Sequence, residues 1–285
     1  MGGGRVLDIR TILCPVDFSP LSDRTLQVAA ALCRRFDARL VLHHNLDARP
    51  PGFLSVSWMW SEDHEDEAAA RAAAAPERMQ KLLAALPEDI DGEARLTRGP
   101  LDRALREVAQ RLPADLIVMG SHGWSNSEHR SVTEKLISKA PCTVLTTNEE
   151  TDPEQLFRPR PGSDPEKLTV LVPVDLEAGS EETLVFVEAM GTMPHEVHVL
   201  HVLEDVRDDP DAAALEARDR VLELVPETLR DRTFIEVRFG KPGEEVLRLA
   251  EEKGSLFIVM AAHPKGILSR FLFGDTALEV LHDSP

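Results

Sequence analysis

Short apolar runs alternate along the chain with longer segments whose apolar residues recur at helical spacing. Runs rich in Val, Ile and Leu occur at Thr11–Val16, Leu40–His44 and Leu116–Met119, and such runs are typical of buried strands. Between the first two runs, Ser22–Arg35 has helical spacing, and Ser22 is of a residue type that caps helices. Strands that alternate with helices in this way predict a parallel sheet covered on both faces.

Further segments extend the same alternation through the first half. We expect helices at Ala68–Leu86 with a break or a new start at Pro76, at Leu101–Arg111 after Gly99-Pro100, and at Val132–Lys139, followed by a strand at Cys142–Thr146. Ligands of such sheets bind at the carboxyl ends of the strands, beside the switch in strand order. In the first half those ends are Asp17, His43–Asn45 and Gly120.

The same series of segments then appears a second time. TILCPVDFS at 11–19 matches TVLVPVDL at 169–176, RLVLH at 39–43 matches VHVLH at 197–201, and LIVMGSH at 116–122 matches FIVMAAH at 257–263. Asp17 and Asp175 are separated by the same number of positions as His43 and His201, so the repeat aligns His43 with His201. An ordered repeat of this kind indicates two copies of one domain.

The domain boundaries follow from the repeat. The chain has 285 residues, enough for two ordinary domains, which we assign to residues 1–147 and 167–285. Residues 148–166 are rich in Pro, Asp and Glu without apolar periodicity, and we interpret them as a linker. The first half is longer between its second and third matched runs, and we assign the surplus to Pro50–Asp66, as an excursion over the carboxyl-end face of the first domain.

These motifs resemble the universal stress protein family. PVDFS after the first strand, Leu-His after the second, Gly-x-Pro before a helix, and DLIVMGSHG followed by S-V-x-x-x-L recur in that family, and the resemblance spans residues 8–147 and 167–285. It implies a doubly wound, parallel five-stranded sheet in each half, with the halves related by a pseudo-twofold axis. The last strand of the second sheet is expected to be missing, since the chain stops at Ser284-Pro285 where that strand is due.

Many members of the family bind ATP through G-x-x-G, nine residues and then G-[S/T], and the resemblance carries this site to the first half. It implies that the base and ribose lie against Pro15, Val16 and Asp17, with His44 where an apolar residue often flanks the adenine. Glycines let the backbone approach the phosphates, and a helix N-terminus supplies amide donors. The residues implied for the phosphates are Met119, Gly120, Gly123, Ser131, Val132 and Thr133.

The phosphate loop departs from the family pattern differently in each half. In the first half Arg130 occupies the second-glycine position and the loop before it, 124–129, is three residues short; Arg130 either pairs with a phosphate or blocks the site. In the second half Ala261 and Pro264 replace the leading glycines, and Asp275 replaces the Ser or Thr. ATP or AMP is therefore expected in the first domain and no cofactor in the second.

Charge and cysteine content narrow the classes of partner. The formal net charge is -18, from 50 acidic and 32 basic residues, which disfavours nucleic acid and anionic membrane surfaces. No apolar run is long enough for a signal peptide or a membrane span, so we expect a cytoplasmic protein. Cys14, Cys33 and Cys142 have no zinc-type spacing and are expected to be reduced thiols.

Two functions of different kinds remain. The first is a stress-response regulator that binds adenine nucleotide without catalysis, as a monomeric pseudo-dimer or a homodimer, since no G-x-S-x-G, H-E-x-x-H or Walker motif occurs. The second is a nucleotide-free interaction scaffold, with both sites decayed and the segment around Trp58 and Trp60 contacting an unknown protein partner. Slow ATP hydrolysis stays open. The histidines at 43, 44, 122 and 129 match no closed zinc pattern.

Overall fold

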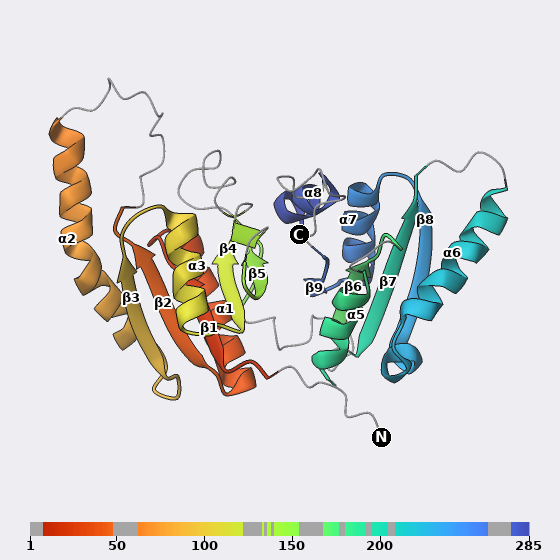
Figure 1. The fold of residues 1–285 in the computed structure, drawn as a ribbon, viewed down its shortest axis with the longest axis horizontal. Coiled ribbons are helices and arrows are strands. Elements are labelled where there is room, and N and C mark those ends of the chain that lie inside the picture. The colour runs from red at the N-terminus through yellow and green to blue at the C-terminus, as the bar shows by residue number, and fades with distance from the viewer. Residues whose placement is uncertain are drawn as a thin grey trace. The chain divides into compact units, whose positions relative to one another are not determined.

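The chain forms two compact units in the computed structural model (Figure 1). The structure describes residues 8–47, 62–121, 133, 136–137, 140–153, 168–176, 180–191, 195–204, 209–261 and 275–284. Residues 8–153 form one unit, the first domain, and the described residues after 153 form the other, the second domain.

The first domain is built on a five-stranded parallel sheet in the order β3-β2-β1-β4-β5. Its elements in chain order are β1 Thr11–Pro15, α1 Pro20–Phe36, β2 Arg39–Asn45, α2 Glu62–Ala84, β3 Gly92–Thr97, α3 Leu101–Arg111, β4 Leu116–Gly120 and β5 Thr143–Thr147.

The second domain repeats this order over four parallel strands, β8-β7-β6-β9. Its elements are β6 Thr169–Pro173, α5 Ser180–Ala189, β7 Glu196–Leu203, α6 Pro210–Leu224, the 3-10 helix η3 Glu227–Arg232, β8 Thr233–Phe239, α7 Pro242–Lys253, β9 Phe257–Ile258 and α8 Asp275–Asp283. These four strands correspond to β3, β2, β1 and β4 of the first domain.

Both faces of each sheet are covered by helices. Neighbouring residues of a strand point to opposite faces. In β1, Leu13 packs with residues of α3, while Ile12 points to the other face, and helices α1 and α2 also contact the strands. In the second domain Val170 lies in a cluster with α5, α6 and η3, and Leu171 lies in a cluster with α7 and α8. The predicted pair of doubly wound parallel sheets is confirmed.

Helix α1 begins earlier than its sequence pattern predicts. The N-cap is Ser19 rather than Ser22, because the Ser19 hydroxyl accepts the backbone N–H of Ser22 at 3.1 Å. Pro20 follows as the first residue of the helix, where a backbone N–H would have no partner within the helix, so proline is tolerated there. The Ser22 hydroxyl is therefore available for a contact at the end of β1.

Helix α2 runs through Pro76 without the predicted interruption. The surrounding alanines have the highest helix propensity, and they offset the one hydrogen bond that a proline removes. The helix also includes 62–66, the end of the segment assigned as surplus. The rest of Pro50–Asp66 lies outside the described residues.

The register of the strands corrects one alignment of the repeat. Pro15 pairs with His43 in the first sheet, whereas Pro173 pairs with Leu200 in the second. The structural counterpart of His201 is therefore His44, not His43. The second domain has one residue fewer between its first two strands than the first domain, which the match of RLVLH to VHVLH concealed.

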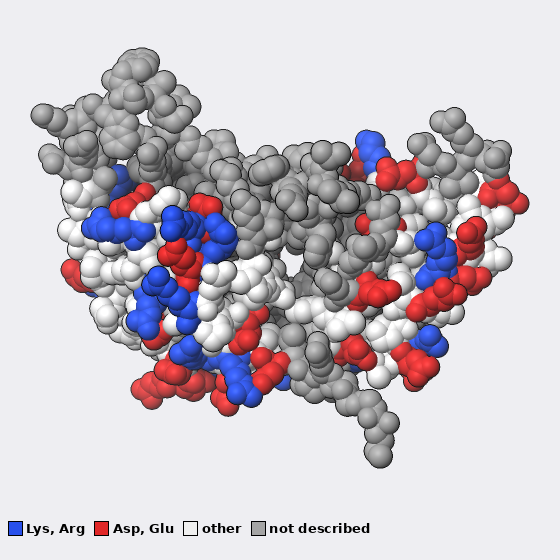
Figure 2. All heavy atoms as spheres, viewed as in Figure 1, with Lys and Arg blue, Asp and Glu red and all other residues white. Residues whose placement is uncertain are grey.

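Charged residues of both signs are intermixed on the face of each domain that Figure 2 shows. Of the described helices, none is long and apolar enough to cross a membrane.

Candidate functional site

The strand order of the first domain creates a switch point between β1 and β4. The chain adds β2 and β3 on one side of β1, and β4 and β5 on the other. Ligands of open α/β sheets bind at the carboxyl ends of the strands beside such a point. The candidate site therefore lies at the carboxyl ends of the strands and is formed by residues 15–17 at the end of β1, His44 in β2, and Met119 and Gly120 at the end of β4.

Asp17 is held at this edge by two serines. The hydroxyl of Ser22 donates to Asp17 Oδ1 at 2.5 Å and accepts the backbone N–H of Asp17 at 2.9 Å. The backbone N–H of Ser19 donates to the same Oδ1 at 2.9 Å. These contacts orient the half-buried carboxylate at the end of β1, where the sequence predicted a ligand for base or ribose.

His44 reaches across from β2 to the same end of β1. Its Nδ1 lies 2.8 Å from the carbonyl oxygen of Val16, and its ring centroid lies 4.4 Å from that of Phe18. The guanidinium carbon of Arg78, from α2, lies 4.0 Å from the Phe18 ring centroid, a cation–π geometry. Phe18 itself has a positive φ of 61°. Neither Phe18 nor Arg78 was predicted from the sequence as part of the site.

A buried polar network next to the site connects β2 with β3 and with Gly99. His43 Nε2 lies 2.8 Å from the Thr97 hydroxyl, and the Asn45 side chain donates to the Gly99 carbonyl at 3.1 Å. Burial lowers the pKa of His43 to about 4, with the neighbouring His44 adding to the effect. His43 is therefore neutral at physiological pH and acts as a structural link between β2 and β3.

The β4 side of the edge is tied to β5. Gly120 pairs with Thr147 in the parallel ladder, so its backbone is extended. The buried hydroxyl of Thr147 lies 2.7 Å from that of Thr25 in α1. Of the phosphate residues implied by the resemblance, Thr133 is buried and helical, while Gly123, Arg130, Ser131 and Val132 lie outside the described residues.

The second domain has the same arrangement at the end of β6. The Ser180 hydroxyl donates to Asp175 Oδ1 at 2.9 Å, and His201 Nδ1 lies 2.8 Å from the Val174 carbonyl oxygen. Leu176, at the position of Phe18, has the same positive φ of 61°. Ala261 takes the position of Gly120 at the end of the β9 segment.

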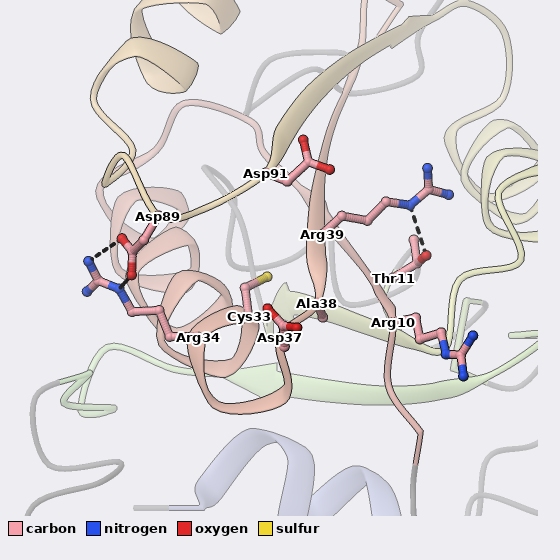
Figure 3. Close-up of a pocket in the computed structure, with 9 residues that line it drawn as sticks. All are labelled: Arg10, Thr11, Cys33, Arg34, Asp37, Ala38, Arg39, Asp89 and Asp91. Carbon is pink, nitrogen blue, oxygen red and sulfur yellow. Dashed lines mark hydrogen bonds and ion pairs between the residues drawn. The ribbon is translucent and has the colours of Figure 1, made fainter.

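A separate hollow lies at the opposite edge of the first sheet, near the amino ends of β1 and β2 (Figure 3). It has a volume of ≈ 650 Å³, and its lining includes the carboxylates of Asp37, Asp89 and Asp91, of which Asp89 pairs with Arg34 at 2.7 Å. It also lies at the C-terminal end of α1, where the helix dipole disfavours anions. Cys33 lines it, and burial raises the pKa of that thiol to about 12, so the thiol stays protonated and unreactive. This hollow does not suit a phosphate-bearing ligand.

No group of three or more His, Cys, Asp or Glu side chains within the described ranges has a geometry that could hold a metal ion. His43 and His44 are instead committed to Thr97 and Val16.

Comparison with known proteins identifies the family. The model of the universal stress protein family matches residues 8–148 and again residues 168–285. Universal stress protein Sll1654 of Synechocystis sp. is 31% identical over 150 residues, which is 50% of this chain and 87% of that protein. A Thermus aquaticus relative, named universal stress protein in QAH/OAS sulfhydrylase 3'region, is 30% identical over 139 residues, 48% of this chain and 96% of its own length.

A solved structure extends the likeness over both halves. The crystal structure of a universal stress protein from Archaeoglobus fulgidus superposes with a TM-score of 0.65 at 20% identity, covering 98% of this chain and 95% of that one. At this identity the likeness concerns the fold. Together with the two family matches, it means that the chain belongs to the universal stress protein family and carries two of its domains in tandem.

Proposed function

We propose that this protein binds adenine nucleotide, ATP or AMP, in its first domain and acts as a non-catalytic, cytoplasmic regulator of the stress response. The observation that carries the proposal is the oriented carboxylate of Asp17 at the switch point of the first sheet, together with two features that, among the described residues, are found in the first domain alone: Gly120 at the end of β4, and the contacts of Phe18 with His44 and Arg78. A carboxylate fixed before the ligand arrives accepts hydrogen bonds from a ribose hydroxyl or a base amine without losing further side-chain entropy.

The phosphates would extend from the end of β4 towards the helix that the sequence predicts at Val132–Lys139. Gly120 has no side chain at the end of that strand, so a ligand can approach its backbone closely. Amide groups at a helix N-terminus favour anions, and Arg130 supplies a positive charge for a phosphate. The net charge of -18 opposes any anion, so the local donors must outweigh that field, and we expect a modest affinity.

The second domain is proposed to lack the nucleotide. It retains Asp175, Ser180 and His201 in the same contacts, but Ala261 adds a side chain at the position of Gly120, and Pro264 removes an amide donor. In the sequence, Asp275 stands where the family pattern has a Ser or Thr, and its negative charge disfavours phosphate.

Mass spectrometry of ligand released from the purified chain, followed by calorimetry with ATP and AMP, tests this proposal. We expect about one nucleotide per chain, with Asp17→Ala reducing the affinity and Asp175→Ala leaving it unchanged. A stoichiometry near two would contradict the assignment to one domain. A protein that neither retains nor takes up nucleotide would contradict the function itself.

One observation favours a protein-interaction role for the second domain as the alternative. Of the six large apolar side chains that are exposed among the described residues, five belong to the second domain, on α5, α6 and β8: Val185, Leu215, Leu222, Phe234 and Phe239. Exposed apolar side chains of this kind are common at protein interfaces. If nucleotide binding is absent while substitution of Leu215 and Phe239 by serine abolishes association with a co-purifying protein, the scaffold function takes its place.

A further inference from the structure

The hydrogen bond between His44 and Val16 defines the tautomer of the imidazole ring. A backbone carbonyl oxygen can only accept a hydrogen bond, so Nδ1, 2.8 Å away, must carry the proton. Burial lowers the pKa of His44, and the positive charge of Arg78 acts in the same direction, while Asp17 and the Val16 carbonyl oppose both. The neutral ring then has a lone pair, and no proton, on Nε2.

This second nitrogen is available to a ligand. Among the residues that the structure describes, Nε2 of His44 has no hydrogen-bond partner, and it is not one of their buried unpaired atoms, unlike Nδ1 of His43. Arg78 lies over the Phe18 ring, and the Phe18 ring, tilted by 42° to the imidazole, packs against His44 and restricts it on one side. The ring is therefore a fixed hydrogen-bond acceptor at the same edge as Asp17.

We propose that His44 is a specificity-determining residue, whose Nε2 accepts a hydrogen bond from the exocyclic amino group of the bound base. This inference rests on the proposed function, since it concerns the base in the same site. A 6-aminopurine offers an N–H donor to Nε2, whereas a 6-oxopurine would set its carbonyl oxygen against the lone pair. The site then prefers adenine to hypoxanthine and guanine by chemistry that an apolar residue at this position does not supply.

Calorimetry of the full chain with three triphosphates tests the preference. ATP is compared with purine riboside triphosphate, which lacks only the amino group, and with ITP, which has an oxygen in its place. We expect ATP to bind about tenfold more tightly than purine riboside triphosphate, the effect of one hydrogen bond, and ITP to bind more weakly still. In His44→Val the ratio of ATP to purine riboside triphosphate should fall to within about twofold.

His201→Val is the matched control. It removes the same hydrogen bond to a backbone carbonyl in the second domain, so any general effect on stability is shared, but the ratio of affinities should remain at the wild-type value. Nitrogen NMR of the wild-type imidazoles reads the tautomer directly and does not depend on the folding of a variant. The proton of His44 is expected on Nδ1, and the Nε2 resonance should shift when ATP is added.

The outcomes separate the two proposals. If ATP binds but His44→Val retains the full preference, or if the NMR spectrum has the proton on Nε2, the role of His44 is overturned while the proposed function stands. If His44→Val does not fold, equal affinities of the wild type for ATP and purine riboside triphosphate overturn it in the same way. A wild-type chain that binds none of the three nucleotides overturns the proposed function, and this inference with it.

Discussion

The ends of β1 and β6 have the same backbone contacts but different surroundings. In both domains a serine five residues on holds the strand-end aspartate, a histidine from the next strand contacts the preceding carbonyl, and the residue after the aspartate has a φ of 61°. In the first domain β4 pairs over five residues with β5. The second domain has only the two residues of β9 at the corresponding place, and they are half-buried.

This difference separates the scaffold of the site from its ligand-facing part. Since the serine, histidine and left-handed contacts occur in both domains, including the one that lacks the phosphate motif, they serve first to shape the strand end. The features found in the first domain alone are the ones that distinguish a binding site: the aromatic and cationic side chains of Phe18 and Arg78, and Gly120.

The largest expected difference concerns how much β4 and β9 contribute to the stability of their domains. Ile117 in β4 is fully buried, whereas its counterpart Ile258 in β9 is half-buried. Ile117→Ala should lower the free energy of unfolding of the first domain by about 3–4 kcal/mol, and Ile258→Ala that of the second by about 1 kcal/mol. Hydrogen exchange measured peptide by peptide in each variant gives both values. Equal losses would mean that the β9 edge is as well packed as β4.

His43 should make the stability of the first domain depend on pH at a position where the second domain has Leu200. Burial lowers the pKa of His43 from 6.5 to about 4 in the folded state. As the pH falls, the unfolded chain therefore binds a proton at His43 before the folded chain does. The contribution of the neutral His43 to the stability of the folded state is complete above pH 6.5 and is lost as the pH falls to about 4. The loss is about 3 kcal/mol.

His43→Leu, which copies the residue of the second domain, tests this contribution. Urea unfolding measures the free energy of unfolding of wild type and variant at each pH from 7 to 4. Over this range the free energy of the wild type should fall by about 3 kcal/mol more than that of the variant. The same slope in both proteins would mean that His43 does not resist protonation in the folded state.

The aspartates should differ in their effect on nucleotide binding. A hydrogen bond to a charged group contributes about 1.5–3 kcal/mol, so Asp17→Ala should weaken ATP binding by about tenfold to a hundredfold. Asp175→Ala loses the equivalent contact to Ser180 and should change the affinity by less than about twofold. Calorimetry on the full chain measures both. Equal weakening by the two variants would place a ligand in each domain.

The smallest effect should be the same on both sides. Ser22→Ala and Ser180→Ala each remove the hydroxyl that holds the strand-end aspartate, and each should lower the stability of its own domain by about 1 kcal/mol. Hydrogen exchange near residues 17 and 175 provides the measurement. A cost confined to Ser22→Ala would contradict the view that this contact is a shared part of the scaffold.

Much of the architecture could be predicted from the sequence because apolar periodicity and the repeat are local signals. The buried strands β1, β2 and β4, and helix α3, were predicted nearly at their observed positions. The edge strands β3 and β8 were not, because a strand with one paired neighbour and one exposed side needs no continuous apolar run. The N-cap of α1 was predicted at Ser22 instead of Ser19, since the choice between two nearby serines depends on where the chain leaves β1.

The sequence by itself determined the two-domain organisation, the doubly wound class, the family, and the aspartate at each strand end, since these depend on the order and spacing of residues. Only the tertiary structure decided that His44 rather than His43 corresponds to His201, that the Ser22 hydroxyl orients Asp17, and that Arg78 lies over Phe18. The physical reason is that strand register and contacts between distant segments depend on the packing of the whole sheet, which the spacing of residues along the chain does not specify.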